Sequence, residues 1–439
     1  MTPSSMYDAV IIGAGPAGYV CAISLAKQGA KVCVIEKEGL GGTCTHKGCI
    51  PTKYLHSMGD IVRKAKSAKK FGINSNVEID YSVLNAKMKS TVAKLASGIS
   101  YLLKENEIEV IKGHAKIESQ NKVIVNDRTL DTENIVLATG SKPKDFHAEN
   151  LVGKILSTDS IFELENLPES ILIVGGGYSG CEFASILNAL GCKIWLVEME
   201  DSLLPGLPKE VGTAIEKYMK LDGISVMTKS SMKISDGKVM INENEINPEK
   251  ILISTGRVPN FNTEELDKLG ITWNDDGIIV NDHMQTNLSN IYAIGDITGK
   301  YELAHVASYQ GEIAAQNILG ENKTMDYSTV PFCIFTYPEV AIVGKCKGNS
   351  KEISMIVNAK ANCLGDTRGF VKVFEENGIL QGTIIVGAHA SEIIAEATLA
   401  IKLKLKPKDV IQTIHAHPTL PEAFVDALRS LDGKNTHTS

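Results

Sequence analysis

The chain has 439 residues, a formal net charge of −7 and nine cysteines. At roughly 150 residues per domain, this length predicts about three domains. The mild negative charge argues against general nucleic-acid binding, and no apolar run reaches the ~18 residues of a membrane span. The odd number of cysteines, most of them single within apolar runs, excludes a secreted disulfide framework. We therefore expect a cytoplasmic protein that binds neither nucleic acid nor membrane.

The first predicted elements are a buried strand over residues 7–12, a glycine-rich turn and a helix. The turn reads G-x-G-x-x-G with Gly13, Gly15 and Gly18, and a second strand ends at Glu36. The three glycines allow a tight turn, close approach of the backbone to a pyrophosphate, and close packing of the helix on the strand. The helix N-terminus would hold phosphates, and the carboxylate would accept hydrogen bonds from a ribose. The pattern predicts a dinucleotide-binding unit.

A pair of cysteines, Cys44 and Cys49, follows this unit and encloses four residues. The spacing exceeds the two residues of a thioredoxin-type motif. No second cysteine or histidine pair nearby completes a zinc site, so we predict no metal. A redox-active disulfide explains the pair better than chance packing of two buried cysteines. The other cysteines are expected to be inert core residues or have no assigned role: Cys21, Cys33, Cys181, Cys192, Cys333, Cys346 and Cys363.

Residues 54–106 are predicted to be largely helical, and 107–140 to form short antiparallel strands. The strand–turn–helix–strand pattern then returns between residues 170 and 198, with Glu198 in the place of Glu36. A carboxylate there repels a 2′-phosphate, and the next three residues offer no Arg or Lys, so this unit should prefer NAD over NADP. The glycines of the second turn are Gly175, Gly177 and Gly180.

Together these features resemble the flavoprotein disulfide reductases, and among them the dihydrolipoamide dehydrogenases of the class I pyridine nucleotide-disulfide oxidoreductase family. The resemblance covers nearly the whole chain and keeps the family's motif order. Besides both glycine turns, it rests on Gly41-Gly42-Thr43-Cys44, Ala138-Thr139-Gly140-Ser141, Gly256-Arg257-Val258-Pro259-Asn260, Gly295-Asp296 and the segment from His415 to Glu422.

The resemblance implies an enzyme that oxidises dihydrolipoyl groups to lipoyl disulfide and reduces NAD⁺, using FAD and a Cys44–Cys49 disulfide. It makes His417 the base and Glu422 its orienting carboxylate, and it places Lys53 beside the flavin, paired with Glu182. A buried Lys–Glu pair can otherwise be a purely structural ion pair.

The resemblance also implies the cofactor contacts. FAD would bind to Gly13, Gly15, Gly18, Glu36, Thr43, Lys53, Gly113, Ala115, Thr139, Gly140, Ser141, Asp296 and Ala304. NAD would bind to Gly175, Gly177, Gly180, Glu198, Gly256 and Arg257.

The implied fold is α/β, with two Rossmann-like dinucleotide-binding domains plus an α+β C-terminal dimerisation domain. We expect an FAD-binding domain at 1–145, an NAD-binding domain at 146–262, a central segment at 263–326 that completes the FAD site, and an interface domain at 327–439. In the family the histidine reaches the disulfide of the other subunit, which implies a homodimer. The partner would be a lipoyl-bearing protein of a 2-oxoacid dehydrogenase or glycine cleavage system, or free dihydrolipoamide.

Several positions depart from the family pattern. Residues 45–47 between the cysteines are unusually polar, and His46 or Lys47 could lower a thiol pKa or simply face solvent. Gln310 stands where an acidic residue is common, and Pro421 where Ser is common. The helix that usually follows Gly344 is missing, so the interface domain is shortened.

Two alternative functions remain open. A glutathione reductase-like enzyme would use NADPH, but it should carry basic residues after the second glycine turn. A lipoyl-domain-binding subunit without turnover would not need the cysteine pair together with His417 and Glu422.

Overall fold

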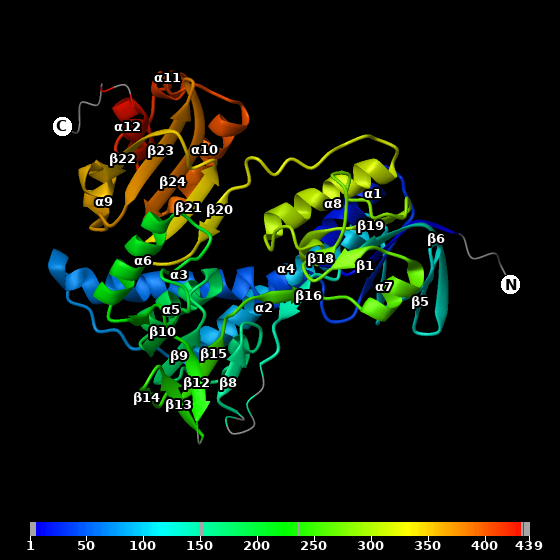
Figure 1. The fold of residues 1–439 in the computed structure, drawn as a ribbon, viewed down its shortest axis with the longest axis horizontal. Coiled ribbons are helices and arrows are strands. Elements are labelled where there is room, and N and C mark those ends of the chain that lie inside the picture. Colours follow the sequence, from blue (N-terminus) through cyan, green and yellow to red (C-terminus); the bar gives the residue numbers. More distant parts are fainter. Residues whose placement is uncertain are drawn as a thin grey trace.

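The computed structural model describes residues 6–146, 148, 151, 153–235, 237–431 and 433. It forms three units around the long helix α3 (Cys49–Ser67), which runs across the left half of Figure 1 at mid-height. The first unit lies to the right, the second below and the C-terminal unit above. None of the described helices is long and apolar enough to cross a membrane.

The first unit is built on a mainly parallel sheet in the order β3-β2-β1-β6-β5-β4, with β19 beside β6. Residues 107–140 were expected to be antiparallel, which is wrong for β3, because it pairs in parallel with β2. Its elements are β1 (Tyr7–Ile12), α1 (Pro16–Ala26), β2 (Val32–Glu36), α2 (Gly42–Lys47), α3, α4 (Tyr81–Glu105), β3 (Glu109–Lys112), β4 (Lys116–Ser119), β5 (Lys122–Val125), β6 (Arg128–Leu137), α7 (Thr263–Leu269), β17 (Trp273–Asn274), β18 (Gly277–Ile278), β19 (Ile291–Ala293) and α8 (Ala304–Ile318).

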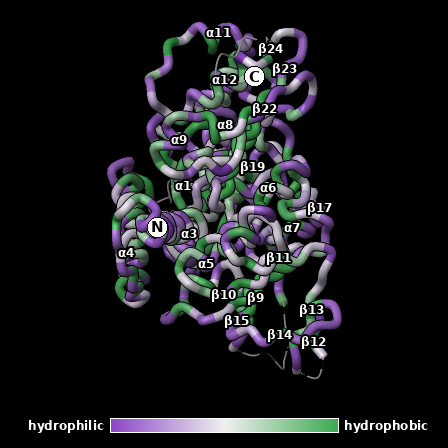
Figure 2. Tube along the Cα trace, turned by 90° about the vertical axis from the view of Figure 1, so that its left-hand side faces the viewer, coloured by the Kyte–Doolittle hydropathy of each residue, from purple (hydrophilic) through white to green (hydrophobic). Residues whose placement is uncertain are grey.

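The second unit repeats this plan with a parallel sheet in the order β11-β10-β9-β15-β8. Its central strands are apolar on both faces, as expected of a parallel sheet covered by helices, and Figure 2 shows them as hydrophobic stretches. Its elements are β8 (Ile155–Ser157), β9 (Ser170–Val174), α5 (Tyr178–Ala189), β10 (Lys193–Val197), α6 (Lys209–Leu221), β11 (Ser225–Met227), β12 (Met232–Ser235), β13 (Lys238–Ile241), β14 (Asn244–Ile246) and β15 (Lys250–Ile253).

Two short antiparallel strands, β7 (Ser141–Pro143) and β16 (Arg257–Pro259), carry the chain into the second unit and back. After the return, β19 extends the first sheet and α8 packs on α1. The central segment therefore belongs structurally to the first unit, because it completes that unit's sheet and core.

The C-terminal unit has an antiparallel sheet in the order β20-β21-β24-β23-β22. A four-residue connection, 345–348, joins β21 to β22, in agreement with the predicted loss of a helix. Together with the two parallel sheets, this unit confirms the expected α/β class. Its elements are β20 (Phe332–Ile334), β21 (Glu339–Gly344), β22 (Asn349–Ser354), α9 (Ala359–Leu364), β23 (Phe370–Glu376), β24 (Ile379–Gly387), α10 (Ala390–Lys402), α11 (Pro407–Ile411) and α12 (Glu422–Leu431).

Candidate active site

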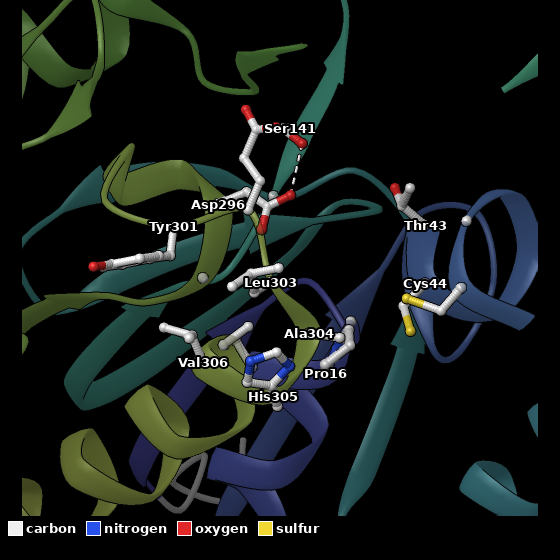
Figure 3. A pocket seen from close by; sticks show the side chains of 18 of the residues that line it. Pro16, Thr43, Cys44, Ser141, Asp296, Tyr301, Leu303, Ala304, His305 and Val306 are labelled. Carbon is white, nitrogen blue, oxygen red and sulfur yellow. Dashed lines mark hydrogen bonds between the residues drawn. The ribbon is translucent and has the colours of Figure 1, made fainter. Parts of the chain in front are cut away.

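A cavity of about 2380 Å³ lies at the carboxyl ends of the first unit's parallel strands and reaches the other two units. It exceeds the ~300–1,000 Å³ typical of a pocket for one small ligand, so an extended ligand fits. In Figure 3, Thr43 and Cys44 lie on one side of the pocket, and Asp296, Tyr301 and Leu303 lie on the other. The predicted site residues that line it are Gly13, Gly15, Glu36, Thr43, Cys44, Cys49, Lys53, Gly113, Ala115, Thr139, Gly140, Ser141, Glu182, Arg257, Asp296 and Ala304.

The other predicted residues are described by the structure but do not line this cavity. Gly18 packs beneath the first turn, and the second glycine turn lies on the neighbouring unit. The C-terminal histidine motif lies just before α12, away from the cysteines of the same chain. The residues concerned are Gly18, Gly175, Gly177, Gly180, Glu198, Gly256, His417 and Glu422.

The glycine turns have the space that a dinucleotide needs. A Cβ on Gly18 would lie 1.9 Å from the carbonyl oxygen of Gly13, so only glycine lets helix and strand pack this closely. A Cβ on Gly15 would meet nothing within 4 Å, which leaves the backbone open toward the cavity. In the second unit, Gly180 shows the same 1.9 Å approach and Gly177 the same open space. Both turns therefore fit a bound pyrophosphate.

The acidic residues at the ends of β2 and β10 are held by the turns themselves. Glu36 accepts a hydrogen bond from the Ala14 N–H at 2.8 Å, and Glu198 accepts one from the Gly176 N–H at 2.7 Å. Each carboxylate also accepts a bond from the backbone two residues further on. This fixes both carboxylates beside the turn, where a ribose of a bound dinucleotide would lie.

Two lysines near the second turn escaped prediction: Lys229, whose N–H donates to the Glu200 carbonyl, and Lys209. Lys209, at the start of α6, lies 3.1 Å from Asp201, three residues after Glu198. The tertiary structure thus brings basic side chains to this region although none follows Glu198 directly in the sequence. The pairing with Asp201 offsets the Lys209 charge, and the buried Glu198 carboxylate still disfavours a 2′-phosphate.

The two cysteines are hydrogen-bonded to each other and half-buried, with Cys44 on α2 and Cys49 at the start of α3. The Cys44 hydrogen bond and the Lys53 charge lower the pKa of Cys49 to about 7, against the opposing effect of burial. The bond to Cys49 and burial raise the pKa of Cys44. In the dithiol form, Cys49 is therefore the sulfur that ionises first.

Lys53 lies one turn along α3 from Cys49 and pairs with Glu182 of α5 at 3.0 and 3.2 Å. The structure therefore brings this predicted pair together. Glu182 is only 8 % exposed and accepts a further bond from the Phe335 N–H at 2.9 Å. The Lys53 Nζ lies 4.5 Å from the centroid of the Phe335 ring. Three units meet at this pair.

A second network of hydrogen-bonded polar side chains lies at β7 and β16. The Ser141 hydroxyl donates to Asp296 at 2.7 Å, as Figure 3 shows, and accepts a bond from Arg257 Nε at 2.8 Å. Arg257 also donates to Asp159 at 2.9 Å. Burial raises the pKa of Asp296. Arg257, predicted to contact NAD, thus directs its guanidinium to the strands that join the two units.

The C-terminal motif forms a compact acid–base pair. His417 Nδ1 lies 2.9 Å from Glu422 Oε1. The other carboxylate oxygen, Oε2, accepts a hydrogen bond from the Thr419 N–H at 2.7 Å. A carboxylate only accepts, so Nδ1 carries the proton and Nε2 is left with a lone pair. The His417 side chain is 70 % exposed. Pro421 immediately precedes α12, where a missing N–H costs little.

His415 has a different environment from its neighbour His417. It is mostly buried and contacts Glu396 at 2.7 Å and the Thr413 carbonyl at 2.8 Å. Burial lowers its pKa, but these hydrogen bonds outweigh that effect and leave the pKa raised. These contacts hold the His415 ring between α10 and the backbone that precedes it.

The remaining departures from the family pattern have local explanations. His46 Nε2 contacts the Leu40 carbonyl at 2.9 Å, and Lys47 pairs with Glu38 at 2.8 Å, so both brace the preceding loop. Gln310 is fully buried, where its carbonyl oxygen accepts the Gly295 N–H at 2.7 Å and its amide donates to Tyr327 at 2.9 Å. An ionised carboxylate could not donate the second bond and would have to accept it from the Tyr327 hydroxyl instead. Gln310 thus supports the turn that carries Asp296.

Comparison with known proteins agrees with this architecture. Residues 7–311 match the family described as pyridine nucleotide-disulphide oxidoreductase, and residues 330–428 match its dimerisation domain. The chain is 39% identical over 442 residues to dihydrolipoyl dehydrogenase of Chlamydia pneumoniae, covering 96% of each chain. It is 36% identical over 457 residues to dihydrolipoyl dehydrogenase of Bacillus subtilis, covering 98% of this chain and 97% of the relative.

Solved structures show the same fold. LpdA from Mycobacterium tuberculosis superposes with a TM-score of 0.87 at 25% identity, covering 96% of this chain and 99% of that one. The HOCl-induced flavoprotein disulfide reductase RclA from Escherichia coli gives 0.86 at 24% identity with the same coverage. The chain belongs to the pyridine nucleotide-disulphide oxidoreductase family.

Proposed function

We propose that the chain is a dihydrolipoyl dehydrogenase, which oxidises dihydrolipoyl groups to lipoyl disulfide and reduces NAD⁺ to NADH. The observation that carries this proposal is the Cys44–Cys49 pair beside Lys53, in a cavity that begins at a dinucleotide turn. Relatives with 34–39% identity over nearly the whole chain bear the same name.

The cofactors of this activity are FAD and NAD, and the residues fit them. FAD would lie along the first turn, Glu36 and the Ser141–Asp296 pair, with Lys53 near its reactive end. NAD would lie against the second turn and Glu198. When bound, the two cofactors supply the two-electron redox chemistry that returns the cysteine pair to its disulfide.

The side chains support a thiol–disulfide exchange. His417 Nε2 takes the proton of one substrate thiol while Glu422 holds the ring through Nδ1. The resulting thiolate attacks the Cys44 sulfur, and the Cys44–Cys49 bond breaks. Cys49 leaves as a thiolate, favoured by its pKa of about 7. The second substrate thiol then displaces Cys44, which closes the lipoyl disulfide and leaves both cysteines reduced.

The active unit in this proposal is a homodimer. The His417 side chain is exposed and lies outside the cavity that holds the cysteines of its own chain, so a second subunit would have to bring it to the disulfide. The matched dimerisation domain, residues 330–428, supports this arrangement.

The electron donor would be a lipoyl group on a 2-oxoacid dehydrogenase or glycine cleavage protein, or free dihydrolipoamide. A cytoplasmic location is part of the proposal. It is supported by the seven cysteines outside the redox pair, which are free thiols in the structure, because a reducing compartment preserves thiols.

The direct test is the steady-state rate of NADH formation by the purified flavoprotein with dihydrolipoamide and NAD⁺. We expect turnover with NAD⁺ and much slower turnover with NADP⁺. Faster reduction of glutathione disulfide by NADPH would instead favour a glutathione reductase-like enzyme. A flavoprotein that binds lipoyl domains but turns over neither substrate would support the non-catalytic alternative.

A further inference from the structure

One face of α3 packs against residues 335–337 of the C-terminal unit, an aromatic segment that follows β20. Lys53 lies under the Phe335 ring at 4.5 Å. His56 stacks on Tyr337 with 4.5 Å between ring centroids and meets Phe335 edge-on at 5.7 Å. Arg63 lies 4.1 Å from the Tyr337 centroid. Lys53, His56 and Arg63 of α3 thus alternate with two aromatic rings.

Where this segment comes closest to α3, the helix carries a glycine. A Cβ at Gly59 would lie 2.6 Å from the Tyr337 hydroxyl, so a larger residue there would push the segment away. The Tyr337 hydroxyl also donates to the His56 carbonyl. Burial lowers the pKa of His56, which favours the neutral ring between the two aromatics.

Phe335 contacts both members of the ion pair beside the cysteines. Its N–H donates to Glu182 at 2.9 Å, and its ring faces the Lys53 ammonium. An aromatic ring attracts a cation through its quadrupole, an attraction that an aliphatic side chain of similar bulk does not provide. The Phe335 ring therefore holds the Lys53 ammonium in position, and the Phe335 N–H holds the Glu182 carboxylate.

We infer that Phe335 is a positioning residue of the active site, which holds the Lys53–Glu182 pair from the C-terminal unit and so fixes a positive charge beside Cys49. The inference deepens the proposed function and rests on it, since it assumes that Cys49 is a redox thiol. It assigns a role in thiol chemistry to a residue that neither glycine turn nor the cysteine motif contains.

The charged and titratable groups that face Cys49 define what the ring can influence. They are Cys44 on α2, Lys53 on α3 and Glu182 on α5. Cys333 on β20 is close enough to Lys53 and Glu182 to feel their charges. Lys53 favours the Cys49 thiolate, whereas Glu182 opposes it. A Lys53 ammonium released from the ring can swing away from the sulfur, and the thiolate then loses its cation.

The experiment measures how fast Cys49 is alkylated by iodoacetamide across a pH series, in the FAD-loaded protein. A Cys44→Ser background leaves Cys49 as the single thiol of the pair and keeps a hydroxyl donor beside it. Mass spectrometry of the peptide that carries Cys49 separates it from the other cysteines. Phe335→Leu should lower the rate at pH 7 by about two- to threefold, and Phe335→Tyr should restore it.

Tyr337→Leu is the matched control, because it removes a ring from the same aromatic segment, and that ring contacts Arg63 and not Lys53. Its pH profile should coincide with that of the background protein. An unchanged profile in Phe335→Leu would overturn the inference, and so would an equal shift in Tyr337→Leu. Thermal unfolding of each variant shows that it is folded. If the unsubstituted chain fails to oxidise dihydrolipoamide while the alkylation shift appears in the Cys44→Ser background, the dihydrolipoyl activity is refuted, whereas the effect of Phe335 on the Cys49 thiol is still shown.

Discussion

Cys44 and Cys49 have the same side chain, yet the structure shifts their pKa values in opposite directions. Cys49 receives a hydrogen bond and lies near the Lys53 ammonium, whereas Cys44 is the donor. The better leaving group in an exchange is the thiol with the lower pKa. In the proposed mechanism these surroundings make Cys49 the leaving thiolate and Cys44 the sulfur that is attacked.

Replacing Lys53 tests the electrostatic part of this assignment. In a Cys44→Ser background, Lys53→Met should raise the pKa of Cys49 toward the ordinary thiol value of 9.0, because the thiolate loses its nearest cation. The thiolate absorbance of the Cys44→Ser background, followed against pH, reports the midpoint. Lys47→Met is the control, since Lys47 pairs with Glu38 and should leave the midpoint in place. Adding Glu182→Gln shows how much of the rise comes from an unpaired carboxylate.

His417 and Glu422 are expected to contribute unequally to the rate. His417→Gln should slow dithiol oxidation by about 10²–10⁴-fold, because a positioned general base is lost. Glu422→Gln should cost less, since the amide oxygen can still accept from Nδ1. Stopped-flow flavin reduction by dihydrolipoamide isolates this half-reaction. His415→Gln should reduce stability more than rate, and an equal loss of rate in that variant would contradict the assignment.

At the scale of elements, the same strand–turn–helix unit is used twice for the same physical reason. In each copy one glycine lies against the backbone of the turn, and another faces open space. The first property joins helix to strand, and the second leaves room for phosphate oxygens. The two functions of the motif can therefore be separated by substitution.

Gly15→Ala and Gly18→Ala should fail in different ways. The Gly15 methyl enters open space, so the variant should fold but bind FAD weakly. The Gly18 methyl would meet the Gly13 carbonyl, so that variant should lose about 1–3 kcal/mol of folding free energy from overpacking. Thermal unfolding and the FAD content after gel filtration distinguish the two. Normal FAD retention in Gly15→Ala would refute the interpretation that the open space at Gly15 holds the FAD phosphates.

At the scale of the whole molecule, α3 is the element on which three units converge. Its apolar face joins a core shared with the second unit and the C-terminal sheet, and Lys53 on α3 bonds to Glu182 of α5. The histidine motif, in contrast, is exposed and remote from its own cysteines. The proposed site is therefore assembled from two subunits.

Subunit complementation tests that assembly. Cys44→Ser and His417→Gln should each be nearly inactive alone. Co-expressed in equal amounts, they should recover about a quarter of the wild-type rate, because half of the randomly paired dimers then hold one intact site of two. Differently tagged chains allow the mixed dimer to be purified and assayed. No recovery in a confirmed mixed dimer would place His417 and Cys44 of one site in the same chain.

Much of the site could be predicted because its motifs are local. The glycine turns, their carboxylates and the cysteine pair act through short-range geometry, so their spacing in the sequence carries the information. Phe335 was not predicted, although the pattern Phe-Thr-Tyr at 335–337 places two aromatics with strand periodicity. Nothing local indicates that their partners lie on α3, some 280 residues earlier.

The sequence alone specified the two dinucleotide units, the redox pair and the family, since each depends on neighbours along the chain. Only the tertiary structure showed that Arg257 turns to Ser141 and Asp159, and that Phe335 bridges Lys53 and Glu182. These contacts join segments from different units, and their geometry follows from how the sheets and α3 pack. Packing of that kind depends on shape and burial across the whole molecule, which no short pattern encodes.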